Sequence, residues 1–184
     1  MGYSNGALSA ATLMSLPEYA DLATQVRGWL LASLHVAVPA DKVFALSATR
    51  YVSMLLPKRK VYNSFDLANV TSDPEVIQRM EADPLFNRVG TMEFFAGIEA
   101  RARALRTGRV RLNRDIRSVW VGHGTADKVH PYTDTKAWYD KQTHLEDGTF
   151  QTYDGWDHQL HASAPGTSEI FYKDIGDWIL ARAK

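Results

Sequence analysis

The sequence contains no cysteine. This absence excludes disulfide bonds, a thiol nucleophile and cysteine-ligated metal sites, and it fits a reducing compartment. An excess of one charge is also missing, because 21 Lys and Arg residues balance 21 Asp and Glu residues. Phosphate binding needs a positive balance, so we expect no nucleic acid partner.

Long apolar runs are missing as well. No segment reaches the roughly 18 uninterrupted apolar residues of a membrane span, and the most apolar stretch, residues 28–40, is interrupted by Ser33 and His35. The first residues have neither the basic region nor the apolar region of a signal peptide. We therefore expect a cytoplasmic protein without a transmembrane segment.

What the sequence does contain is the composition of a globular domain, with 45% hydrophobic and 23% charged residues in 184. Apolar runs predict three buried strands, at residues 28–33, 116–121 and 149–153. Helical periodicity marks residues 7–16, 43–55, 72–82, 92–108, 132–143 and 168–179. The order predicts an α/β fold with a parallel sheet, in which residues 1–37 and 114–184 form the core and residues 38–113 form a helical insert.

Several helix ends carry recognisable signals. Ser72 and Glu75 predict a capping box in front of one helix, and Thr91 predicts a cap for the next. Gly108 is expected to end that second helix, and Ser168 to cap the C-terminal one.

Gly2-Tyr3-Ser4-Asn5-Gly6 matches the pattern G-x-S-x-G. In a nucleophile elbow the serine occupies a strained turn, and side chains at the flanking glycines would clash with the neighbouring strand and helix. A helical pattern follows the motif, whereas no strand pattern precedes it. On this pentapeptide alone, a flexible glycine-rich terminus is an equally good interpretation.

Two further polar segments follow predicted strands. Asp127 closes a glycine-rich turn after one strand, and His158 and His161 follow the next. Alone, each has a plain explanation as a turn aspartate or a solvated histidine. Together with Ser4 they stand in the chain order Ser, Asp, His, each on the same expected sheet edge, as an α/β-hydrolase triad requires.

At this point the sequence resembles the monoacylglycerol lipase branch of the α/β-hydrolases, in the serine aminopeptidase-like group, and its fungal members most of all. The resemblance extends over essentially the whole chain. The matching segments are residues 27–31, 71–76, 81–85, 120–127, 153–161 and 177–179.

The resemblance implies Ser4 as nucleophile, Asp127 as orienting acid and His158 as base. His161 is implied to take no part, and the backbone N–H of Asn5 to stabilise the oxyanion. No cofactor or metal is implied. The family elbow usually reads G-H-S-M-G-G, and this sequence departs from it at Tyr3, Asn5 and Ala7.

Asp157 is another departure, since it stands beside His158 where a large residue is common. We expect it either to raise the pKa of His158 or to compete with Asp127 for that ring. Other charged groups receive plainer interpretations. The seven arginines between residues 101 and 117 predict a solvated face, and His35 a structural role. His123 and His130 flank Asp127 without a recognisable metal-ligand spacing.

The largest departure is an absence. The family places several strands before the elbow, together with a His-Gly loop that supplies a second oxyanion donor. Neither is found here, nor is a strand that feeds the elbow, so we expect the C-terminal part of the fold with its N-terminal strands absent. Losing one donor lowers turnover about a hundred- to a thousand-fold, so the 184-residue chain by itself is expected to be a poor enzyme.

The resemblance predicts hydrolysis of carboxylic esters of single-chain lipids through an acyl-enzyme. The insert is expected to be an almost wholly helical cap that roofs an apolar pocket and touches membranes or lipid droplets peripherally. Expected pocket residues are Val43, Leu46, Leu55, Phe95 and Ile98. Two alternatives stay open: another carboxylesterase or peptidase of the superfamily, and an inactive fragment acting as a packing or interaction module.

Overall fold

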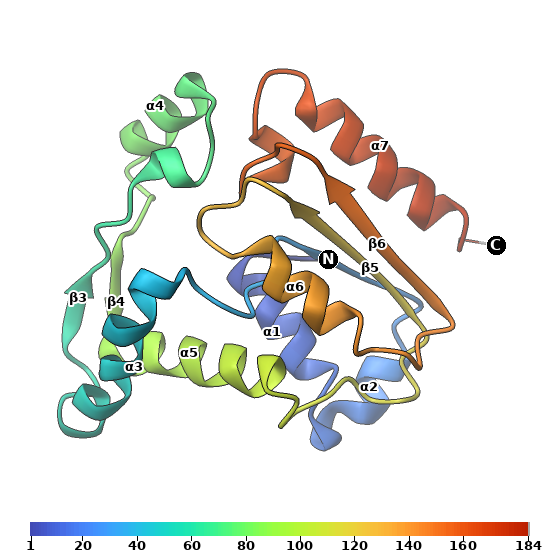
Figure 1. Cartoon of the computed structure of the whole chain (residues 1–184), viewed down its shortest axis with the longest axis horizontal. Coiled ribbons are helices and arrows are strands. Elements are labelled where there is room, and N and C mark those ends of the chain that lie inside the picture. Colours follow the sequence, from blue (N-terminus) through green and yellow to red (C-terminus); the bar gives the residue numbers. More distant parts are fainter. Residues whose placement is uncertain (184) are drawn as a thin grey trace.

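A four-stranded parallel sheet forms the centre of the molecule (Figure 1), a computed structural model that describes residues 1–183. The strand order is β1-β2-β5-β6. Their bounds are Gly2–Tyr3, Trp29–Ala32, Ser118–Gly124 and Asp147–Tyr153. Val119, Trp120 and Val121 are all buried, because a parallel strand covered on both faces needs a nearly continuous apolar run.

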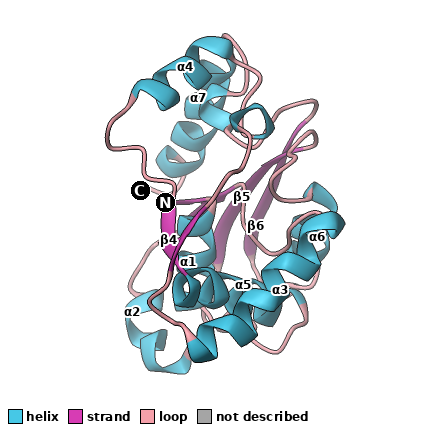
Figure 2. Ribbon diagram, turned by 90° about the vertical axis from the view of Figure 1, so that its left-hand side faces the viewer, coloured by secondary structure: helices cyan, strands magenta, loops and turns pink. Residues whose placement is uncertain are grey.

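Helices cover both faces of this sheet (Figures 1 and 2). On one face α1 (Asn5–Leu13), α5 (Met92–Arg106) and α6 (Tyr132–Tyr139) pack on Leu31 and Val121. Alternate strand residues point to the other face, where α7 (Thr167–Leu180) packs. The remaining short elements of the core are α2 (Ala20–Thr24) and single turns at Pro17–Tyr19 and Leu160–Ala162.

The central sheet contains one strand more than the three predicted. Gly2 and Tyr3 pair in parallel with Leu31 and Ala32, so a strand does feed the elbow, contrary to expectation. Two residues are too few to show a periodic pattern, and this strand is defined only by the neighbour with which it pairs.

Residues 38–113, called the insert below, are not almost wholly helical. They contain α3 (Ala40–Leu55), α4 (Pro74–Ala82) and α5, together with a short turn at Leu67–Asn69. They also contain β3 (Lys60–Tyr62) and β4 (Val89–Thr91), which pair antiparallel and form the narrow arm that reaches α4 (Figure 1). The all-helical cap is therefore wrong, since three-residue strands show no period of their own.

The helix-end signals have mixed outcomes. Thr91 caps α5 by accepting a hydrogen bond from the N–H of Phe94, and Gly108 follows the helix at φ 72°, as predicted. The cap of α4 is Asp73 rather than Ser72. Ser168 lies inside α7, which begins directly after Gly166. The observed cap lies one residue after the predicted one in α4 and two residues before it in α7.

Candidate active site

Ser4 occupies the turn between β1 and α1. Its φ of 53° is a left-handed conformation that is uncommon for a residue other than glycine. A Cβ on Gly2 would lie 2.6 Å from the carbonyl oxygen of Gly6, so this position requires glycine. A Cβ on Gly6 would meet no described atom within 4 Å. The predicted steric need for both glycines therefore holds only for Gly2.

The structure brings Ser4, His158 and Asp127 together. Nε2 of His158 lies 2.9 Å from the Ser4 hydroxyl, and its Nδ1 lies 2.8 Å from Oδ2 of Asp127. The three residues follow β1, β6 and β5, so the C-terminal ends of parallel strands bring them to one edge. Because Nδ1–H donates to the carboxylate, Nε2 is left as an acceptor for the serine proton.

Asp127 accepts three hydrogen bonds and lies close to a further histidine. Oδ1 accepts from the backbone N–H groups of Val129 and His130, each at 2.8 Å. Oδ2 accepts from His158. Nε2 of His123 lies 3.0 Å from the same oxygen and 3.1 Å from the carbonyl oxygen of His130, so its one hydrogen is shared between them. Burial would raise the pKa of Asp127, but the bonds from His123 and His158 outweigh it and hold the pKa well below its ordinary value. The carboxylate is therefore ionised at neutral pH.

Two more histidines lie near the nucleophile. Neither was assigned a role in the site from the sequence. Nε2 of His130 lies 3.5 Å from the Ser4 hydroxyl, and His35 stacks on His130 with ring centroids 3.9 Å apart. Burial, followed by the nearby His158, lowers the pKa of His35 to about 4. Burial and His35 lower that of His130 as well. Within residues 1–183, no group of three or more His, Asp or Glu side chains is arranged to hold a metal ion.

The second histidine of the last loop lies elsewhere. The His161 ring packs edge-on against Tyr3, 5.5 Å between centroids, and its Nε2 lies 3.1 Å from the side-chain nitrogen of Gln159. It therefore makes no described contact with Ser4.

Asp157 does not compete for His158. Its Oδ2 accepts a 2.8 Å hydrogen bond from the backbone N–H of Ser72, and its own N–H donates to Ser163 at 2.7 Å. The expected competition with Asp127 is wrong, because the partner of Asp157 comes from the insert, 85 residues away in the chain.

The same loop makes further bonds to the insert. The N–H of Gln159 donates to the carbonyl of Val70 at 2.9 Å, and the Ser72 hydroxyl donates to the carbonyl of Ser163 at 2.8 Å. The Thr71 hydroxyl donates to the carbonyl of Ala162. We call these contacts between residues 70–72 and 157–163 the clasp. They connect the insert directly to the loop that carries His158.

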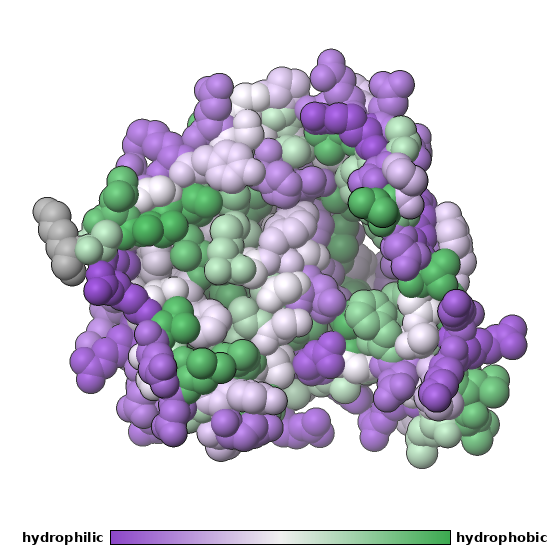
Figure 3. Space-filling model, turned by 180° about the vertical axis from the view of Figure 1, so that it is seen from behind, coloured by the Kyte–Doolittle hydropathy of each residue, from purple (hydrophilic) through white to green (hydrophobic). Residues whose placement is uncertain are grey.

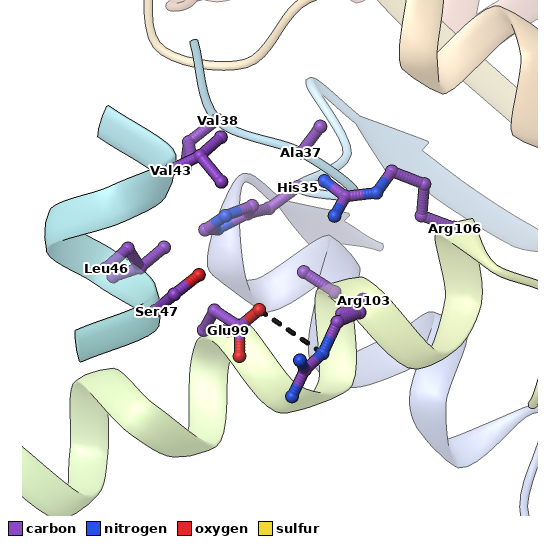
Figure 4. A pocket seen from close by; sticks show the side chains of 10 residues that line it. His35, Ala37, Val38, Val43, Leu46, Ser47, Glu99, Arg103 and Arg106 are labelled. Atoms are coloured by element: carbon purple, nitrogen blue, oxygen red, sulfur yellow. Dashed lines mark ion pairs between the residues drawn. The ribbon is translucent and has the colours of Figure 1, made fainter. Parts of the chain in front are cut away.

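A small hollow of about 20 Å³, enough for about one water molecule, opens between α3 and α5 (Figure 4). Val43 and Leu46 line it as expected, whereas Leu55 is exposed and Ile98 belongs to the core below. Phe95 packs close to Gly90 of β4. The lining also has a polar side, where His35, Ser47, Glu99, Arg103 and Arg106 gather.

The sheet, the elbow and the three hydrogen-bonded side chains define a protein of the α/β-hydrolase class. The family model described as serine aminopeptidase, S33, matches residues 1–164, and the chain belongs to this family.

Proteins similar to this chain include monoacylglycerol lipases. A Schizosaccharomyces pombe protein whose name assigns it as a monoglyceride lipase is 26% identical over 138 residues, 74% of this chain and 35% of its own length. A soluble variant of the Saccharomyces cerevisiae monoglyceride lipase superposes with a TM-score of 0.84 at 13% identity, covering 100% of this chain and 61% of that one.

The Paleococcus ferrophilus monoacylglycerol lipase gives a TM-score of 0.83 at 19% identity, covering 99% of this chain and 67% of its own. Identities this low establish the shared fold alone. The chain spans about a third of the curated relative and about two thirds of these solved structures.

Proposed function

We propose that this protein is a serine hydrolase that cleaves carboxylic esters of single-chain lipids, as a monoacylglycerol lipase does. The observation that carries the proposal is the pair of hydrogen bonds from Ser4 to His158, at 2.9 Å, and from His158 to Asp127, at 2.8 Å. A serine is a weak nucleophile unless an adjacent base removes its proton, and this geometry supplies the base.

The proposed reaction has two halves. The Ser4 oxygen attacks the ester carbonyl carbon while Nε2 of His158 takes its proton, and the ionised Asp127 stabilises the imidazolium that forms. His158 then gives this proton to the departing alcohol, which leaves an acyl-enzyme. Water attacks the acyl group in the second half, again with His158 as base, and releases the carboxylic acid and free Ser4.

The oxyanion formed in each half needs hydrogen-bond donors. Asn5 opens α1, and backbone N–H groups in a first helical turn have no intrahelical acceptor, so the Asn5 N–H is suited to this role. Within the described residues we assign one donor.

Apolar surface on the insert supports a lipid substrate and peripheral contact with a lipid surface. α3 has no buried residue, and Phe44, Met54 and Leu55 on it are 75–86% exposed. From behind, green side chains are visible at the tip of the insert, at the lower right of Figure 3. No helix in residues 1–183 is long and apolar enough to span a membrane.

A second candidate is a carboxylesterase for shorter or more polar acyl groups. The hollow favours it. His35 of its lining stacks on His130 beside Ser4, and the hollow is small. Its polar residues Glu99, Arg103 and Arg106 would not suit a long alkyl chain. The two candidates share the chemistry of Ser4 and differ only in the acyl group they accept.

The proposal is tested with a fluorophosphonate probe and three substrates: a monoacylglycerol, p-nitrophenyl butyrate and an aminoacyl p-nitroanilide. We expect the probe to label Ser4, and the Ser4→Ala and His158→Gln variants to lose labelling. His161→Gln is the matched control, because it changes a histidine of the same loop that does not contact Ser4. Its labelling rate should stay within about two-fold of the parent rate.

The outcomes separate the alternatives. Labelling with preference for the monoacylglycerol supports the lipase, and preference for the butyrate supports the carboxylesterase. Cleavage of the anilide would assign a peptidase instead. Folded protein without any labelling at Ser4 would overturn the proposal and leave an interaction module.

A further inference from the structure

A second imidazole stands beside the nucleophile, and the reaction described above does not use it. His130 is 4% exposed, and its Nε2 lies 3.5 Å from the Ser4 hydroxyl oxygen. Its Nδ1 lies 3.2 Å from the carbonyl oxygen of Ala37. A carbonyl can only accept, so the proton is on Nδ1, and Nε2 presents a lone pair toward Ser4.

The His130 ring is held firmly in this orientation. His35 stacks on one face of it at 3.9 Å, and the His158 ring meets it edge-on at 4.8 Å. The backbone N–H of His130 donates to Asp127 at 2.8 Å, which links its position to that of the proposed orienting acid. Burial lowers the pKa of His130 well below its ordinary value, so the lone pair is present at neutral pH.

The serine hydroxyl cannot satisfy both histidines, because it has one hydrogen. His158 is the nearer acceptor, at 2.9 Å against 3.5 Å. Nε2 of His130 is therefore a buried acceptor beside the nucleophile that receives no hydrogen from the serine. A buried acceptor without a donor is unfavourable. The step of the reaction that brings a second donor to this place is the entry of water.

We propose that Nε2 of His130 positions the water that hydrolyses the acyl-enzyme. The inference rests on the proposed function. One water hydrogen passes to His158 as the oxygen attacks the acyl carbon, and the other points at His130. When the intermediate collapses, the bond to the Ser4 oxygen breaks and that oxygen takes the proton back from His158. The second hydrogen is not transferred and stays on the released acid.

The test separates acylation from deacylation by stopped-flow with a p-nitrophenyl ester. The burst of p-nitrophenol, one equivalent per site, reports acylation even when turnover is slow, and the steady-state rate reports deacylation. His130→Phe keeps a ring of similar size without an acceptor. We expect its deacylation rate to fall about ten-fold, as the loss of one hydrogen bond implies, while its burst rate stays within about two-fold.

Two amide variants provide the rescue. Gln places its side-chain oxygen near the former Nε2, whereas Asn is too short to reach that place. His130→Gln should recover most of the deacylation rate and His130→Asn should not, and this comparison decides the matter if His130→Phe fails to fold. His161→Gln is again the histidine control and should leave both rates within about two-fold.

If the burst rate and the steady-state rate of His130→Phe fall equally, or if neither falls, the role of His130 is overturned while the proposed function stays in place. Equal deacylation rates in the Gln and Asn variants would overturn it too. If the fluorophosphonate probe fails to label Ser4 in the unmutated chain, the proposed function fails, and this inference fails with it.

Discussion

The sheet edge and the insert are built in opposite ways. At the sheet edge, Asp127 is 8% exposed and accepts three hydrogen bonds, and His158 is held between two partners. In the insert, α3 buries none of its residues and Phe44 is 86% exposed. Dense packing holds Asp127 and His158 in place, while α3 has little packing around it and is expected to open at a lower free energy.

The boundary between these regions does not follow the chain. α5 belongs to the insert by its position in the sequence, yet Ile98, Ala102 and Leu105 lie in the same apolar core as α1 and the sheet. The loosely packed part is therefore α3, β3, β4 and α4. The clasp at residues 70–72 fastens this part to the loop of His158.

The largest contrast is expected between the two glycines of the elbow. In Gly2→Ala the new Cβ would meet backbone atoms of Gly6 and Ala7 at 2.6–2.8 Å, and backbone cannot move aside cheaply. We expect a loss of about 1–3 kcal/mol in the free energy of unfolding and little labelling of Ser4. Gly6→Ala meets open space inside α1 and should stabilise by up to about 1 kcal/mol.

Urea unfolding and the rate of fluorophosphonate labelling measure both variants of the elbow. Similar losses in Gly2→Ala and Gly6→Ala would contradict the asymmetry and would mean that something besides residues 1–183 occupies the space beside Gly6.

Removing Asp157 tests the clasp. Asp157→Ala leaves the backbone N–H of Ser72 without its acceptor and should lower the free energy of unfolding by about 1–3 kcal/mol. Asp157→Asn keeps a side-chain oxygen and should lose less. Asp177→Ala is a matched control, because that exposed carboxylate pairs with Lys173 on the surface, and it should change stability by less than about 0.5 kcal/mol.

Amide hydrogen exchange shows whether the clasp joins the two regions. In Asp157→Ala, exchange should become faster both at residues 70–72 and in the loop of His158. Faster exchange on one side alone would mean that the two regions move independently.

Acid should destabilise the sheet edge through His35. Its folded pKa is lowered to about 4 from 6.5, so between these values the unfolded chain binds a proton that the folded chain does not. Stability therefore falls as the pH drops from 7 to 5, by about 2 kcal/mol for this group. The lowered pKa of His130 acts in the same direction.

The His35→Phe variant isolates this contribution. Between pH 7 and pH 5, the free energy of unfolding should drop by about 2 kcal/mol less in this variant than in the parent chain. From pH 7 to pH 9, the two curves of unfolding free energy against pH should run parallel. The lowered pKa of Asp127 contributes stability that is retained until the pH falls below its unfolded value of 3.8, so it does not interfere. Parallel curves over the whole range would contradict a buried, neutral His35.

The smallest effect on stability is expected on α3. Phe44→Asp and Leu55→Asp change side chains that are 86% and 83% exposed. The free energy of unfolding should therefore change by no more than about 0.5 kcal/mol in either variant. Binding to phosphatidylcholine vesicles, measured by cosedimentation, should nevertheless weaken. Tyr172→Asp, on α7 and 55% exposed, is the control and should leave vesicle binding unchanged. Equal weakening in all three variants would remove α3 as the contact.

Much of the fold follows from local patterns. The apolar runs predicted β2, β5 and β6 to within a few residues, and caps such as Thr91 marked helix ends correctly. Ser4, Asp127 and His158 were singled out by their short motifs and by the family resemblance. The structure brings the three side chains together, and their catalytic roles stay predictions. Such features depend on residues close together in the chain, so their signals survive in a single sequence.

Other features were decided only by the tertiary structure. β1 exists because it pairs with β2, and β3 pairs with a strand more than twenty residues further along the chain. His130 reaches Ser4 across 126 residues, and Asp157 reaches Ser72 across 85. No periodic pattern or short motif encodes such contacts, because they depend on how separate elements pack. The sequence by itself therefore determined β2, β5 and β6, the longer helices and the order of the polar motifs. Packing determined the short strands and which buried groups surround the serine.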